Sequence, residues 1–138
     1  MIRGVNRALA VGLVVFLAGA ARDIQWHATH DTQTEFETAS KQIEVHWLLW
    51  LGALALIVCS WLAIRRSEAA RRSRGYLVVF ISGAVYAVVS VWHFIEHANG
   101  NDPQLAHAFL YAAATGMTVG LLLALVAARR PALPPGRS

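Results

Sequence analysis

The sequence predicts an all-α integral membrane protein, built as a four-helix transmembrane bundle with both termini in the cytoplasm. Of its 138 residues, 57% are hydrophobic and only 14% are charged, whereas about a quarter of the residues in a soluble domain are charged. Four apolar runs each approach the roughly 20 residues that a helix needs to cross the hydrocarbon core of a bilayer. Clusters of arginine flank these runs, as is typical of the charges that set the orientation of membrane helices. We therefore expect contact with the lipid bilayer and no nucleic-acid partner.

The four expected helices form a single domain over residues 1–130. Their approximate ranges are 5–29, 35–64, 75–98 and 103–129. The last helix should have Asp102 as its N-cap and Pro103 as its first residue. The Pro-rich tail at residues 131–138 is expected to be disordered and cytoplasmic.

The first apolar run has two interpretations. Arg3 and Arg7, a short apolar centre and the small residues at 18–21 also describe a cleavable signal peptide. We favour an uncleaved membrane anchor, because one continuous helical face of this run ends in Asp23 and His27, two residues of the kind that bind metals.

The second helix is expected to start above the membrane. Thr34 and Glu37 have the spacing of a capping box, so the helix should begin near Thr34. Its small and polar face carries His46 and should pack inward, while Glu44 lies on the aliphatic side at the level of the lipid headgroups. The basic stretch at 65–74 is expected to be a short cytoplasmic loop near anionic lipid.

The charges predict the orientation of the bundle. Ten of the twelve basic residues fall on one side of the four helices, and this side is expected to be cytoplasmic. The opposite side holds all six histidines and seven of the eight acidic residues. We therefore expect the metal-binding types of residue on the extracytoplasmic side of the cell membrane.

The third apolar run carries a polar stripe at helical spacing. It reads Ser82, Tyr86, Ser90, His93 and His97 in a segment otherwise rich in valine and alanine. Polar groups that face lipid are costly, so the stripe should look into the bundle. Tyr86 is expected to be a hydrogen-bonding core residue, as is Tyr111 on the fourth helix.

Every helix thus delivers candidate metal ligands to the outer end of the bundle. The candidates are Asp23, His27, His46, His93, His97 and His107, with His30 and Asp31 just beyond the first helix. Imidazole and carboxylate together suit zinc or iron, and also manganese or copper(II). There are too many candidates for one four-coordinate ion, so either two metals bind or some residues orient the ligating imidazoles. Asp23 and Glu96 are natural partners for the second role. Cys59 is the only cysteine, which excludes a cysteine-rich site.

Three local patterns resemble known metalloprotein families. His93, Glu96 and His97 form an H-x-x-E-H sequence, which is similar to the motif of inverzincin peptidases. That resemblance implies two zinc-binding histidines and a glutamate that acts as general base. The bundle also resembles four-helix di-iron carboxylate proteins, although their two Glu-x-x-His motifs are absent from this chain. The His-x-x-x-His spacing with a remote histidine and aspartate resembles the zinc site of seven-helix membrane lipid hydrolases.

These residues predict a small membrane metalloprotein whose His/carboxylate site could be dinuclear. If it is an enzyme, it should hydrolyse or oxidise a small or lipid-phase substrate, with Glu96 as general base. One alternative is a haem b electron-transfer protein, in which two of the histidines ligate the iron. Another is a non-catalytic accessory subunit that senses a metal or protons, acting in a homo-oligomer or with a partner membrane subunit.

Overall fold

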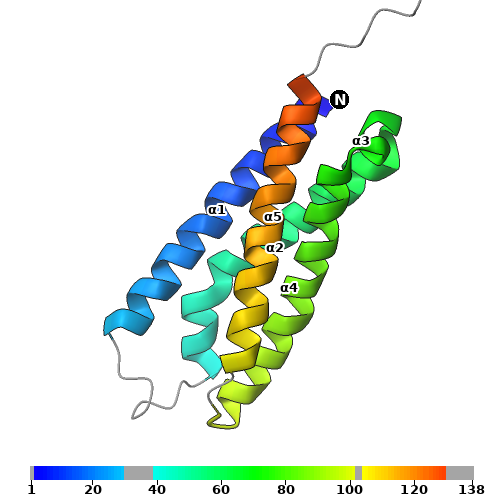
Figure 1. The fold of residues 1–138 in the computed structure, drawn as a ribbon. Coiled ribbons are helices and arrows are strands. Elements are labelled where there is room, and N and C mark those ends of the chain that lie inside the picture. Colours follow the sequence, from blue (N-terminus) through cyan, green and yellow to red (C-terminus); the bar gives the residue numbers. More distant parts are fainter. Residues whose placement is uncertain (1, 30–38, 102–103, 130–138) are drawn as a thin grey trace, which may run out of the picture.

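A computed structural model of the protein describes residues 2–29, 39–101 and 104–129, which are almost entirely helical and contain no strand. The four long helices are α1 (Ile2–Thr29), α2 (Ala39–Arg66), α4 (Arg74–Ala98) and α5 (Gln104–Arg129). Each is long and apolar enough to cross a membrane. The predicted all-α, four-helix membrane bundle is confirmed, and the chain is a multi-pass membrane protein (Figure 1). Its orientation in the membrane stays a prediction.

The basic stretch between the second and third membrane helices is not a simple loop. It contains the short helix α3 (Glu68–Arg72). The Ser67 side chain caps this helix by accepting a hydrogen bond from the Ala70 backbone N–H, 3.3 Å away. Ala70 is buried and anchors the turn against the bundle. The expected capping box at Thr34, the cap at Asp102, Pro103 and the tail at 131–138 lie outside the described residues.

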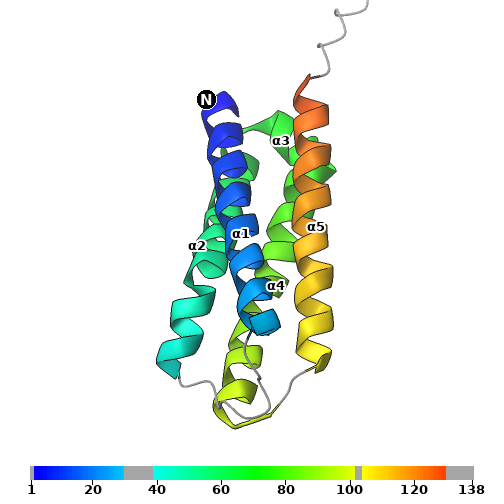
Figure 2. The ribbon, with the colours of Figure 1, turned by 90° about the vertical axis from the view of Figure 1, so that its left-hand side faces the viewer.

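The bundle consists of two closely packed hairpins, α1–α2 and α4–α5, which meet mainly through α2 and α4 (Figures 1 and 2). Glycines allow the helices of each hairpin to approach. A Cβ added at Gly19 would lie 2.5 Å from the backbone nitrogen of Leu49, and one at Gly75 would overlap the backbone of Ala124. Small residues at such crossings are the usual means by which membrane helices pack. By contrast, α1 and α5 make few contacts with each other.

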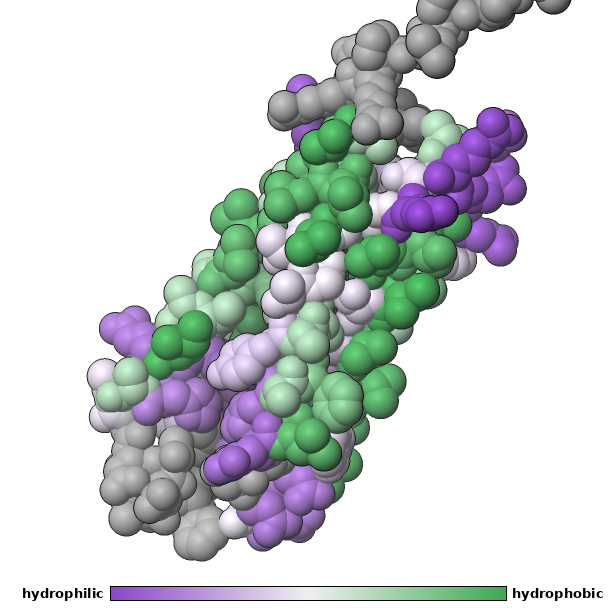
Figure 3. Space-filling model, viewed as in Figure 1, coloured by the Kyte–Doolittle hydropathy of each residue, from purple (hydrophilic) through white to green (hydrophobic). Residues whose placement is uncertain are grey.

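Side chains divide into a core and a lipid-facing surface. Phe16, Leu56, Met117 and Leu121 are almost fully buried at the centre of the bundle. Many large aliphatic side chains are exposed along the outside, as expected where hydrocarbon replaces water. Figure 3 shows this hydrophobic surface along the length of the bundle, with hydrophilic residues gathered towards its two ends.

The two ends of the bundle have different polar contents. At the end that carries α3, the Tyr76 hydroxyl donates a hydrogen bond to Oδ1 of Asn6, 2.6 Å away, and so ties α4 to α1. At the other end, α1 and α4 finish and α2 and α5 begin. The candidate metal ligands therefore gather at that second end.

Candidate metal centre

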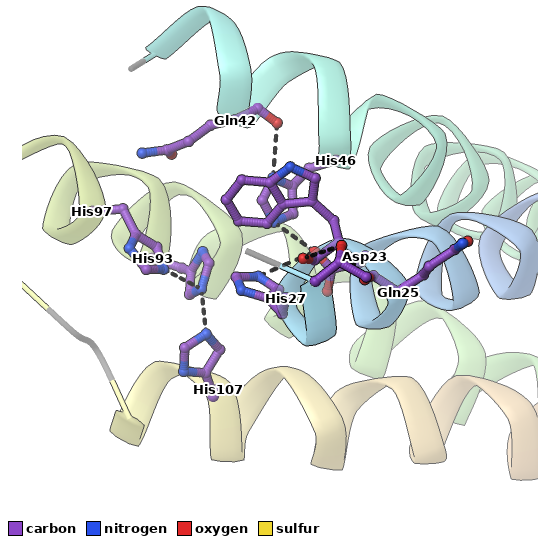
Figure 4. A network of polar contacts seen from close by, with 10 residues as sticks. Asp23, Gln25, His27, Gln42, His46, His93, His97 and His107 are labelled. Atoms are coloured by element: carbon purple, nitrogen blue, oxygen red, sulfur yellow. Dashed lines mark hydrogen bonds and ion pairs between the residues drawn. The ribbon is translucent and has the colours of Figure 1, made fainter. Parts of the chain in front are cut away.

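All six predicted metal ligands lie together at one end of the bundle and fall into two sets of three. Each set comes from one hairpin, and within each set the candidate ligand atoms lie within 4.8 Å of one another. The α4–α5 set is His93, His97 and His107. The α1–α2 set is Asp23, His27 and His46. Figure 4 shows both sets converging on the interior of the bundle.

In the α4–α5 set, the Nε2 atoms of three imidazoles lie close together, at hydrogen-bond distances from the central His93. Nε2 of His93 lies 2.8 Å from Nε2 of His107 and 3.1 Å from Nε2 of His97. The i, i+4 spacing places His93 and His97 on one face of α4. The first turns of α5 bring His107 against that face. His93 is the central member and is only 5% exposed.

In the α1–α2 set, two imidazoles flank one carboxylate oxygen. Oδ1 of Asp23 lies 3.0 Å from Nε2 of His46 and 3.5 Å from Nε2 of His27. Asp23 and His27 are four residues apart on α1, while His46 faces them from the first turns of α2. Oδ1 of Asp23 is inaccessible to solvent and accepts no hydrogen bond from the described residues. Two imidazole nitrogens therefore flank a carboxylate oxygen that is closed to solvent.

The tautomer of His46 explains why this arrangement suits a cation. Nδ1 of His46 lies 2.8 Å from the backbone carbonyl oxygen of Gln42, one turn earlier. A carbonyl can only accept, so Nδ1 must carry the hydrogen. In the neutral ring, Nε2 then presents a lone pair to the Asp23 carboxylate oxygen 3.0 Å away, and the two groups repel. A proton or a metal ion between these two groups removes the repulsion, and fixing one imidazole nitrogen through the other is how metal-binding histidines are oriented.

The separations match those between ligands of one ion. With bonds of about 2.1 Å, two neighbouring ligand atoms lie about 3.0 Å apart around an octahedral ion and about 3.4 Å apart around a tetrahedral one. The Asp23–His46, Asp23–His27 and His93–His97 separations, at 3.0, 3.5 and 3.1 Å, fall close to these values. The His93–His107 separation of 2.8 Å is slightly shorter. Only small side-chain movements would be needed to admit an ion to either set.

The two sets are adjacent. The ring centroids of His46 and His93 are 5.8 Å apart, and those of His27 and His107 are 6.4 Å apart. Figure 4 shows His27 between Asp23 and the α4–α5 imidazoles. Two ions held here would be close neighbours.

Glu96 takes a different direction from the histidines beside it. Its carboxylate accepts hydrogen bonds from the Trp92 indole N–H at 3.2 Å and from the Asn101 side-chain amide at 2.7 Å. Its oxygens belong to neither ligand set. Glu44 is exposed and pairs with Lys41 at 3.2 Å, away from both sets. The candidates His30 and Asp31 lie outside the described residues.

Two residues contact His46 in a way that the sequence analysis did not predict. The Gln42 backbone carbonyl holds His46, and the Trp50 ring stacks on the imidazole of His46 with centroids 6.1 Å apart. Both lie four residues from His46 on α2, so the i±4 spacing is the signal that could have identified them. Deeper in the bundle, Tyr86 is buried, as predicted, and packs edge-on against Phe16 with ring centroids 5.1 Å apart. Tyr111 is 63% exposed, so the prediction that it lies in the core was wrong.

Two cavities adjoin this region. The smaller, of about 60 Å³, lies among all four long helices and is partly lined by Asp23, His46, His93 and His107. The larger, of about 370 Å³, is an apolar groove between α2 and α4, and none of its lining residues is a histidine. Tyr86 borders both of them.

The donor chemistry of the two sets differs. Two imidazoles and one carboxylate in the α1–α2 set make the combination typical of non-haem iron(II) sites with open positions. Three imidazoles in the α4–α5 set make a combination found in catalytic zinc sites. Comparison of the chain with protein-family models, with curated proteins and with solved structures found no match.

Proposed function

We propose that the protein is a membrane metalloprotein with a dinuclear His/carboxylate centre at the extracytoplasmic end of its bundle. The observation that carries this proposal is the His46–Asp23 contact. A buried imidazole whose Nδ1 donates to a carbonyl turns its other nitrogen to a solvent-inaccessible carboxylate oxygen 3.0 Å away. A bound cation satisfies both groups at once. The three converging imidazoles of the second hairpin support a second ion beside the first.

Zinc and iron are the metals that the donor atoms favour. The α1–α2 set suits iron(II), and the α4–α5 set suits zinc, with manganese or copper(II) as further choices for these donors. A metal ion supplies a Lewis acid and an activated water molecule, which serves hydrolysis, while iron also serves oxidation. The protein's own part is to hold the ions and exclude bulk water. Glu96 is our candidate for the general base, which requires its side chain to turn from Trp92 and Asn101 towards the ligands.

Haem b binding is the alternative from a different functional class. A haem needs a broad, flat, mostly apolar slot between two histidines. The groove between α2 and α4 is the larger of the two cavities but has no histidine among its lining residues. Two of the histidines, His27 and His46, instead flank a carboxylate. These observations favour metal ions over haem. A Soret band in the purified protein would reverse the preference.

The decisive experiment counts metal ions in protein purified in detergent. We expect two equivalents of metal in the wild type. His46→Ala should lose the ion of the α1–α2 set, His107→Ala should lose the ion of the α4–α5 set, and the double variant should bind none. Glu44→Ala is the matched control, because Glu44 lies two residues from His46 on the same helix but is exposed and pairs with Lys41. It should retain both ions.

The outcomes separate the claims. A wild type that takes up no zinc, iron, manganese or copper, even after reconstitution, refutes the metal centre. Loss of both ions in each single variant would show one coupled site instead of two. If metal is bound and hydrolysis and oxidation tests remain negative, the accessory role in metal storage or sensing is favoured over an enzyme.

A further inference from the structure

The side of the bundle between α1 and α5 is its least closely packed side. These helices run next to each other, as both ribbon views show, but they make few contacts, whereas the α1–α2 and α4–α5 pairs are closely packed (Figures 1 and 2). The small cavity lies on this side, because eight of its twelve lining residues belong to α1 or α5. It reaches inward as far as His46 on α2 and His93 on α4.

The lining of this cavity is polar at one end and apolar elsewhere. Four of the six candidate metal ligands contribute to the polar end. Phe16, Ala20, Leu49, Leu110 and Ala114 contribute apolar walls. A molecule in the cavity would therefore place its polar end at the metal ligands and an apolar part between the helices.

The cavity borders the lipid-facing surface. Ile24 on α1 and Tyr111 on α5 both line it, and they are 60% and 63% exposed. Both belong to membrane-spanning segments, so their exposed surfaces meet the bilayer and its boundary. The phenol of Tyr111 is amphipathic, which suits a position at the edge of such an opening.

The size of the cavity limits what can occupy it. Its volume is about 60 Å³, less than half of the roughly 150 Å³ of an engineered protein cavity that holds benzene. An aromatic or quinone ring is therefore too wide. A single unbranched alkyl chain is narrow enough, and its remaining carbons can stay in the bilayer between α1 and α5.

We propose that the ligand of this site is a single-chain aliphatic molecule with a metal-binding polar end, and that it reaches the metal centre sideways from the bilayer between α1 and α5. This inference rests on the proposed metal centre and names the substrate class of that centre. The bilayer is the source of such molecules, because their chains partition into hydrocarbon.

The test uses cobalt(II)-loaded protein and n-alkyl hydroxamates as probes. The hydroxamate group binds the metal and changes the visible spectrum of cobalt, which reports occupancy without any turnover. We expect affinity to rise by about fourfold for each methylene that enters the cavity, along the series from acetohydroxamate to hexanohydroxamate. Benzohydroxamate should bind no more tightly than acetohydroxamate, because its ring exceeds the cavity.

Variants that narrow the opening identify the route. Ala114→Leu on α5 and Ala20→Leu on α1 add carbons to the cavity wall from opposite sides. Each should bind cobalt as the wild type does, bind acetohydroxamate with similar affinity and lose most of the gain with chain length. Ala87→Leu is the matched control, because Ala87 lines the groove between α2 and α4 and does not line the small cavity. It should keep the full gain.

The results distinguish a failure of the proposed lateral route from a failure of the proposed metal centre. Absence of bound cobalt in the wild type overturns the metal centre and this inference together. Cobalt binding with the same chain-length dependence in the wild type, Ala114→Leu and Ala20→Leu overturns the route and leaves the centre intact. Tight binding of benzohydroxamate overturns the single-chain class.

Discussion

The close contact between α1 and α2 gives a way to disturb one ligand set without touching its side chains. Gly19 lies one turn before Asp23 on α1, and its partner Leu49 lies three residues after His46 on α2. In Gly19→Ala, the new Cβ would lie 2.5 Å from the backbone nitrogen of Leu49 and 2.9 Å from the carbonyl carbon of Leu48. Both atoms belong to the main chain of a helix and cannot rotate away. The two helices must therefore separate locally by about 1 Å to reach ordinary contact.

That displacement is large compared with the tolerance of a metal site. It would lengthen the Asp23–His46 contact from 3.0 Å towards 4 Å, beyond the separation of about 3.0–3.4 Å that neighbouring ligands of one ion keep. We expect affinity at the α1–α2 set to fall at least 10- to 100-fold, which is the effect of losing a residue that only orients a ligand. The overpacking itself should cost roughly 1–3 kcal/mol of stability.

The assay is metal titration of Gly19→Ala followed by elemental analysis, together with thermal unfolding in detergent. We expect one equivalent bound tightly, by the α4–α5 set, and a lower unfolding temperature than that of the wild type. Gly4→Ala is the matched control, since a Cβ there meets nothing within 4 Å. It should bind two equivalents and unfold no earlier. If Gly19→Ala retains two tight ions, the idea that close α1–α2 packing sets the site geometry is wrong.

Three further predictions concern other parts of the molecule. Tyr76→Phe should lower the free energy of unfolding by about 1 kcal/mol, because it removes the 2.6 Å hydrogen bond to Asn6. The metal content should not change, and a changed metal content would contradict the separation of the two ends. The orientation can be tested with single cysteines in a Cys59→Ser background and a thiol reagent that does not cross the membrane. Glu68→Cys should react only from the cytoplasmic side, and Asn101→Cys should react only from the outside. The reverse pattern would refute the predicted orientation. Acidification should release the metal reversibly, because imidazole binds a metal only in its neutral form; metal retained in strong acid would contradict histidine ligation.

The four helices were predictable because a bilayer allows a long apolar segment few other structures. With no water to satisfy the backbone, such a run must be helical, and its length follows from the membrane thickness. The short helix α3 was missed because it lies in a charged segment without an apolar run. It depends instead on a local detail, the cap by Ser67 and the burial of Ala70.

Helical periodicity also predicted which histidines would meet, but not what Glu96 would do. At about 100° per residue, His97 lies about 40° from His93 around the helix axis, while Glu96 lies about 60° from His93 on the other side. The two histidines therefore share a face, and the glutamate stands at its margin. Its direction was decided by neighbours that the motif does not contain, namely Trp92 and Asn101, which bind its carboxylate.

The division into two ligand sets could not be predicted, because it depends on which helices pair closely. Glycine contacts fix α1 against α2 and α4 against α5, so each hairpin assembles its three ligands through local packing. The contact between α2 and α4 then sets the distance between the sets, represented by the 5.8 Å between the His46 and His93 rings. The geometry of each candidate site and the distance between the two candidate sites thus depend on different helix contacts. A substitution within one hairpin should remove one ion. A substitution at the contact between α2 and α4 should leave both ions bound and change how they interact.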